Sequence, residues 1–205
     1  MRRATAVLLL ALAALTGAAG DADALEPHAR DGWVLGLSYG GARGKAEFAG
    51  GVSAETEDGV SPQIRFGHML GRHLSLGASY VGWLYETGDA PIKYRFSMQN
   101  IMLALTWYPG RADSPLGGLY LRGGAGLAWA SIAEVELVVG EEQSHGERET
   151  DTGLGLELNL GYEFRVAHSA AVGLGIGINH QLIDGELYDT STYFPVTLNL
   201  GWYWD

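Results

Sequence analysis

The clearest structural pattern in this chain is Leu154-Gly155-Leu156-Glu157-Leu158-Asn159-Leu160-Gly161-Tyr162-Glu163-Phe164. Every even-numbered position in it is large and apolar, and every odd-numbered position is glycine or polar. Successive side chains of a β-strand point to opposite faces, so this stretch predicts a strand with one bulky apolar face and one small polar face. Such a strand suits a barrel that stands in lipid with its apolar face outward.

Similar alternation recurs along the chain and predicts further strands. With the stretch above, the predicted strands cover residues 32–40, 61–70, 74–85, 93–108, 119–131, 154–164, 171–182 and 194–204. Short turns alternate with longer loops, and the main loops are Gly41–Gly59 and Ile132–Asp151. Even strand numbers, short periplasmic turns and long external loops are typical of outer-membrane barrels. We therefore predict an all-β fold, an eight-stranded antiparallel up-and-down transmembrane β-barrel.

The fourth predicted strand changes phase along its length. Phe96 and Met98 share one parity, whereas Ile101 and Leu103 share the other. An extra residue near Gln99-Asn100 would bring both sets to the same face, so we predict a β-bulge there.

The N-terminus has the three parts of a secretory signal. Arg2-Arg3 is followed by the apolar residues Ala6–Leu15 and by the small-residue site Ala22-Asp23-Ala24. The apolar part is too short to span ~30 Å of hydrocarbon as an anchor helix. We predict a cleaved signal peptide over residues 1–24 and a barrel domain over residues 25–205.

Composition excludes several classes of protein. The chain has no cysteine, which excludes a disulfide framework, thiolate metal sites and a catalytic thiol. Its net charge is −11 and no basic face is evident, so we expect no nucleic-acid partner.

The main structural rival is a soluble barrel of the lipocalin type, in which the bulky residues point inward. Glycine on a wall that faces water weakens a strand without compensating packing, whereas glycine inside a narrow barrel makes room for long side chains. Aromatic residues near the strand ends also suggest the two interfacial girdles of a membrane barrel. The predicted girdles contain Trp33, Trp107, Tyr108, Tyr162, Phe164, Trp202 and Trp204 at one end, and Tyr85, Tyr94, Trp129, Tyr193 and Phe194 at the other.

Two segments carry a resemblance to a known family. Residues 118–127, GLYLRGGAGL, resemble the fifth strand of small outer-membrane barrels of the OmpA, OmpX and opacity-protein type. Residues 196–204, VTLNLGWYW, resemble the closing strand that the outer-membrane assembly machinery recognises, although Asp205 follows where the family usually ends on an aromatic residue.

The resemblance implies a location in the bacterial outer membrane. It also implies contact with outer-membrane lipid and lipopolysaccharide, and an assembly signal formed by Trp202, Tyr203 and Trp204. It indicates an architecture and not an activity.

Four charged residues fall on the predicted inner faces: Arg65, Arg122, Glu157 and Glu163. Unpaired charges in a narrow, partly dry interior are costly, so opposite charges there should pair. We predict that Arg122 lies near Glu163 and that Arg65 reaches toward Glu157. This network either plugs and stiffens the interior or forms a gate for a small conductance.

An enzymatic function has weaker support. His180 lies on a predicted strand, and outer-membrane lipid A deacylases, which the segment resembles in part, carry His-x-Ser-Asn. Here Leu182 and Ile183 occupy the serine and asparagine positions, so the nucleophile is missing. The acidic residues of Ile132–Asp151 also lack the ligand spacing of a calcium loop. We expect no catalytic residue, metal or cofactor.

These observations predict an outer-membrane barrel with a structural or surface-interaction role, in adhesion or envelope integrity, through its external loops. The alternatives are a small gated channel and, with less support, a lipid-modifying enzyme.

Overall fold

The computed structural model describes residues 30–48, 52–53, 56–87, 92–110, 114–138, 141–149, 152–183, 185 and 188–205. The predicted signal peptide lies outside these residues. The strands are β1 (Trp33–Phe48), β2 (Val52–Ser53), β3 (Glu57–Gly71), β4 (Leu74–Thr87), β5 (Ile92–Trp107), β6 (Leu119–Val138), β7 (Glu141–Glu149), β8 (Gly153–Ala167), β9 (Ala170–Leu182) and β10 (Tyr188–Trp204).

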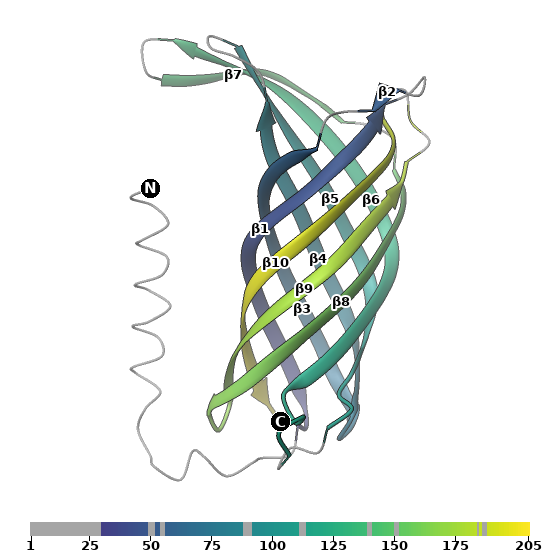
Figure 1. The fold of residues 1–205 in the computed structure, drawn as a ribbon, viewed down its shortest axis with the longest axis vertical. Helices are drawn as coiled ribbons and strands as arrows, with labels where there is room; N and C mark the ends of the chain where they lie inside the picture. The colour runs from purple at the N-terminus through teal and green to yellow at the C-terminus, as the bar shows by residue number, and fades with distance from the viewer. Residues whose placement is uncertain are drawn as a thin grey trace.

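Eight of these strands, all except β2 and β7, form a closed barrel (Figure 1). Each strand pairs antiparallel with its neighbours, and β1 pairs with β10 to close the ring. The β1–β10 pairing begins with Trp33 opposite Trp204. Closure satisfies the backbone hydrogen bonds around the whole ring, as lipid requires. The predicted eight-stranded antiparallel barrel is therefore confirmed. Within the described residues, no helix is long and apolar enough to cross a membrane.

The two faces of β8 lie as its sequence predicts. Leu156, Leu158 and Leu160 point outward and are 39%, 52% and 44% exposed. Glu157 and Asn159, between them, are buried inside the barrel. The bulky apolar side chains therefore form the outer wall, which excludes the inverted, lipocalin-like arrangement.

Several strands extend well past their predicted ends. β1 continues to Phe48 and β3 begins at Glu57, so most of the predicted loop Gly41–Gly59 is strand. β6 continues to Val138 and pairs with β7, so the predicted loop Ile132–Asp151 contains a β-hairpin. Backbone pairing with a neighbour satisfies N–H and C=O groups whatever the side-chain pattern, so the ladder continues where the alternation ends.

The predicted bulge in the fourth strand is wrong. β5 pairs with β4 and β6 in an unbroken register from Tyr94 to Trp107. Phe96 and Met98 are instead buried inside the barrel, while Ile101 and Leu103 face outward. The apparent change of phase reflects an apolar inner wall at this level and not an inserted residue.

The predicted aromatic girdles are confirmed only in part. At the end with the short turns and the C-terminus, Trp33, Trp107, Phe164 and Trp204 are exposed on the outer wall. At the opposite end, Phe194 is exposed on the outer wall, whereas Tyr94 is exposed but shares the inward parity of Phe96 on β5. Three residues assigned to the girdles, Tyr85, Tyr108 and Tyr193, are instead buried inside the barrel.

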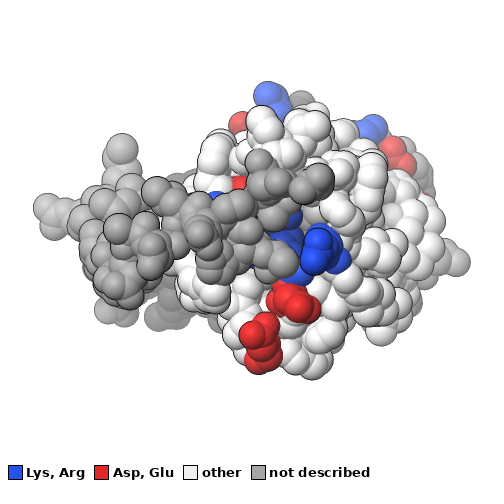
Figure 2. All heavy atoms as spheres, turned by 90° about the horizontal axis from the view of Figure 1, so that it is seen from below, with Lys and Arg blue, Asp and Glu red and all other residues white. Residues whose placement is uncertain are grey.

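The barrel has two different ends. The connection between β8 and β9 and that between β3 and β4 are short, and they lie at the lower end of Figure 1 with the C-terminus. Because short turns face the periplasm in such barrels, we assign the lower end to the periplasmic side. Figure 2 shows this end from below, where basic side chains near the middle adjoin acidic ones on a mostly uncharged surface.

A charge on the outer wall should be strongly destabilising. We expect Leu158→Arg to lower the free energy of unfolding by about 2–4 kcal/mol, because its charge would sit in the hydrocarbon layer. Guanidinium unfolding in lipid vesicles, followed by tryptophan fluorescence, measures this loss. The matched control is Leu116→Arg, in an exposed position between β5 and β6, where about 0–1 kcal/mol is expected. Equal losses at the two positions would contradict the orientation of β8.

Candidate functional site

The interior contains two buried ion pairs. Arg65 of β3 pairs with Glu163 of β8, and Arg122 of β6 donates from Nε to Glu157 Oε1 over 3.1 Å. Their side chains are almost fully enclosed. Ser79 also donates to Glu157, over 3.1 Å. The four charged residues singled out in the sequence therefore all face the interior, and all are paired.

The predicted pairing of these charges is wrong, because the two arginines exchange their predicted glutamate partners. Arg122 is directly opposite Asn159 in the β6–β8 register, so Glu157 is its diagonal neighbour, within reach of a long side chain. Glu163 lies four residues beyond Asn159 in the other direction, past Tyr120 and its partner Gly161. The stagger of the strands thus brings Glu157 to Arg122 and leaves Glu163 to Arg65.

Gly36 makes room for the side chain of Arg65. A Cβ atom at residue 36 would lie 2.1 Å from Arg65 Nε and 2.4 Å from its Cγ, far inside contact distance. The two residues are directly opposite each other on β1 and β3. The absence of a side chain at Gly36 therefore lets Arg65 run across the interior toward Glu163.

We expect Gly36→Ala to destabilise the barrel by about 1–3 kcal/mol, because the methyl group displaces Arg65. In an Arg65→Ala background the same substitution should cost much less, since the clashing atoms are gone. Unfolding of the two single variants and the double variant in vesicles gives this coupling. Additive losses would show that the clash with Arg65 is not the cause.

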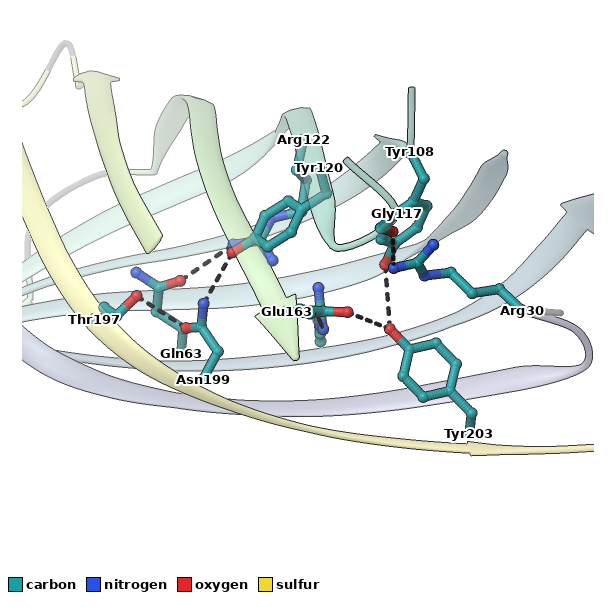
Figure 3. Close-up of polar contacts among 11 residues, drawn as sticks. Arg30, Gln63, Tyr108, Gly117, Tyr120, Arg122, Glu163, Thr197, Asn199 and Tyr203 are labelled. Carbon is teal, nitrogen blue, oxygen red and sulfur yellow. Dashed lines mark hydrogen bonds and ion pairs between the residues drawn. The ribbon is translucent and has the colours of Figure 1, made fainter. Parts of the chain in front are cut away.

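Further hydrogen bonds join the polar part of the interior (Figure 3). Tyr203 donates its hydroxyl to Glu163 Oε2 over 2.5 Å, and Arg122 Nη2 donates to Gln63 Oε1 over 3.2 Å. Asn199 donates from Nδ2 to the hydroxyl of Tyr120 over 2.9 Å. Beside Arg65 and Arg122 lies a cavity of only about 10 Å³, room for about one water molecule. The polar network therefore fills its level of the barrel.

Toward the external end the interior is apolar and aromatic. Trp83 stacks on Tyr85 with ring centroids 4.4 Å apart and on Tyr193 at 5.2 Å. Tyr85 in turn stacks on Phe96 at 4.8 Å. We call this group the aromatic cluster; its large members are Trp83, Tyr85, Phe96, Met98, Met102, Tyr188 and Tyr193. The alternating pattern did not predict the aromatic cluster, because that pattern implies an inner face that is small and polar throughout.

Amide side chains connect the aromatic cluster to the rest of the interior. Asn100 donates from Nδ2 to the hydroxyl of Tyr193 over 3.1 Å, and Gln181 donates to Asn100 Oδ1 over 2.8 Å. Ser191 donates its hydroxyl to Gln181 Oε1 over 2.7 Å. The interior thus holds two stacked layers of filling side chains, one charged and one aromatic.

The remaining candidate residues lie apart from this network, except for Tyr203. His180 Nδ1 lies 2.8 Å from the Thr192 hydroxyl, directly across the β9–β10 ladder, and Leu182 faces outward. In the predicted assembly signal, Trp202 is half-buried, Tyr203 points into the barrel and Trp204 is exposed. Among the described residues, no three His, Asp or Glu side chains come together as a metal site.

Comparison with solved structures finds the same architecture. Neisserial surface protein A superposes with a TM-score of 0.58 at 15% identity, covering 86% of this chain and 100% of that chain. Ail, the attachment invasion locus protein of Yersinia pestis, superposes with a TM-score of 0.52 at 12% identity, covering 85% of this chain and 99% of that chain. At these identities the likeness shows the fold alone. No curated protein sequence matches the chain.

The family assignment rests on sequence as well as on fold. The model of the outer membrane protein beta-barrel domain matches residues 5–202, nearly the whole chain. Together with the closed barrel and its apolar outer wall, this match identifies the chain as a member of the outer membrane protein beta-barrel family, located in the bacterial outer membrane.

Proposed function

We propose that this protein is a closed barrel with a structural or surface-interaction role, in adhesion or envelope integrity, and that its external end performs this role. The supporting observation is the filled interior. The ion pairs of Arg65 and Arg122 occupy one level, and the aromatic cluster around Trp83 occupies another. Eight-stranded barrels have an interior just wide enough for side chains to fill, so a continuous water path is not expected.

The external end offers the surface for such a role. The end of β6 and its partner β7 form a hairpin that rises beyond the barrel at the end opposite the C-terminus (Figure 1). The two similar proteins are named as a surface protein and an attachment invasion locus protein, which agrees with a surface role. The exposed strand extensions would then contact the partner, while the barrel holds them in the membrane.

We also propose that the barrel contacts membrane lipids and the outer-membrane assembly machinery. Outer-membrane lipid and lipopolysaccharide would contact the wall of exposed leucines, and the assembly machinery would recognise Trp202, Tyr203 and Trp204. We propose no enzymatic activity, because His180 contacts a threonine hydroxyl and no described carboxylate orients its ring.

Two measurements test this proposal. The first is cell aggregation and surface attachment by bacteria that express the chain. We expect the chain to increase both, and a variant with residues 134–149 replaced by a short Gly-Ser turn to lose most of the increase. The control variant replaces His168-Ser169, the turn at the opposite end, by Asn-Gly, and should retain it. Attachment that survives loss of the hairpin would overturn the surface role.

The second measurement is the current across planar bilayers that contain the purified protein. We expect no steady conductance from the wild type or from Glu157→Gln, because the other luminal side chains still fill the interior. A stable conductance of the wild type, or one that Glu157→Gln opens, would favour the gated channel instead.

A further inference from the structure

The periplasmic end of the interior holds more positive than negative charge. Arg30, just before β1, is only 5% exposed, and Arg165, near the end of β8, is half-buried. The buried carboxylate nearby, Glu163, is already bound by Arg65 and by the Tyr203 hydroxyl. Two further guanidinium groups therefore lie at this end without an ion-pair partner among the described residues, and the other acids there, Asp31 and Asp205, are exposed.

The guanidinium group of Arg30 is held in place, but not all of its N–H donors have an acceptor. Its Nη2 donates to the carbonyl oxygen of Gly117 over 2.5 Å, and its guanidinium carbon lies 3.9 Å from the centroid of the Tyr108 ring (Figure 3). Its Nε is buried and has no hydrogen-bond acceptor. The stacking orients a planar fork of N–H donors, and among the described residues only the Gly117 carbonyl accepts from it.

Arg165 repeats this arrangement on the neighbouring tyrosine. Its guanidinium carbon lies 3.8 Å from the centroid of the Tyr203 ring, and its Nη1 donates to the carbonyl oxygen of His168 over 3.2 Å. Its Nη2 is buried and has no acceptor. The hydroxyls of Tyr108 and Tyr203 lie 3.4 Å apart, so the two stacked pairs meet at the same mouth.

In the described part of the chain these two arginines share the charge of one buried carboxylate, Glu163, which Arg65 already binds. Neither Arg30 nor Arg165 forms an ion pair with any carboxylate there. Both stack on tyrosines whose hydroxyls lie 3.4 Å apart, so the two like charges lie at the same mouth. Enclosed cations without a partner are costly, and an anion that bridges them would relieve both the repulsion and the unused donors.

We propose that Arg30 and Arg165 form a binding site for a soluble oxyanion, a carboxylate or a phosphate, at the periplasmic mouth of the barrel. The planar guanidinium fork matches the oxygen pairs of these groups. The rings on which the two arginines stack, Tyr108 and Tyr203, are buried inside the barrel, whereas lipid headgroups surround the barrel from outside. This position favours a ligand from the periplasm over a membrane lipid.

The test is calorimetric titration of the purified full-length protein, in zwitterionic detergent at low salt, with inorganic phosphate and separately with acetate. We expect saturable binding of one anion per chain. Arg30→Gln and Arg165→Gln should each weaken binding by about tenfold, the worth of one charge-assisted hydrogen bond. The matched control is Arg72→Gln, which removes one positive charge from an exposed turn at the same end and should leave binding unchanged.

Fold is checked by the gel shift on boiling, and Arg30→Lys gives a second variant in case Arg30→Gln does not fold. Lysine keeps the charge but not the planar fork, so we expect weaker binding. Absence of saturable binding, or equal binding by the Arg30→Gln/Arg165→Gln double variant, overturns the site.

Two further arms identify the source of the anion. Nanodiscs with phosphatidylglycerol added to phosphatidylcholine should leave the phosphate affinity unchanged, and competition by phosphatidylglycerol would overturn the assignment to a soluble ligand. Deletion of Asp205, which follows the Trp204 partner of Trp33, should also leave it unchanged. Much tighter binding after this deletion would mean that a carboxylate of Asp205 fills the site, and would equally overturn the proposal.

Discussion

Glu163→Leu should lower the free energy of unfolding by about 3–5 kcal/mol, because it leaves Arg65 charged and unpaired inside the barrel. The side chains of this pair are 10% and 2% exposed, so water cannot replace the lost partner. Tyr203 also loses its acceptor. Guanidinium unfolding in vesicles, followed by circular dichroism, measures the loss.

The double variant Arg65→Met/Glu163→Leu separates the cost of an unpaired charge from the worth of the pair. Removing both charges should restore most of the stability, since apolar groups of similar volume replace buried ion pairs at little cost. The control is Arg43→Ala, which breaks the exposed pair with Asp58 and should cost at most about 1 kcal/mol. A double variant no more stable than Glu163→Leu would contradict this explanation.

Trp83→Ala should lower the free energy of unfolding by a similar amount, about 3–5 kcal/mol. Trp83 is fully buried in the aromatic cluster, and its removal leaves a cavity between Tyr85 and Tyr193. The same unfolding measurement applies, because circular dichroism does not depend on this tryptophan.

Trp83→Phe is the matched control, because it keeps an aromatic ring in the stack. The Nε1 of Trp83 is buried without an acceptor, so losing this donor removes a cost as well as some contact. We expect a loss well below that of Trp83→Ala. Equal losses for the two variants would mean that the stacking of the cluster contributes little.

The sequence was sufficient to predict the architecture. In β8 the even-numbered positions are large and apolar, and the odd-numbered positions are glycine or polar, so both the strand and its orientation could be predicted. In β5 the inner face carries Phe96 and Met98 at one end and Asn100 further along. A rule that equates bulky with outward fails there, because this barrel has both a polar and an apolar interior level.

The sequence predicts which charged residues lie inside the barrel, but not which of them pair with each other. Parity alone placed Arg65, Arg122, Glu157 and Glu163 inside. Their partners depend on the stagger between strands, and alternation of period two carries no information about that stagger. Arg30 was missed because it precedes the first strand and belongs to no alternating pattern.

Spin-label accessibility shows whether the leucine face of β8 contacts lipid, on which the outer-membrane barrel depends. The chain has no cysteine, so a cysteine at Leu158 can be labelled alone. In vesicles, we expect frequent collisions of this label with dissolved oxygen and almost none with a water-soluble nickel complex. Frequent collisions with the nickel complex at Leu158 would contradict this lipid contact.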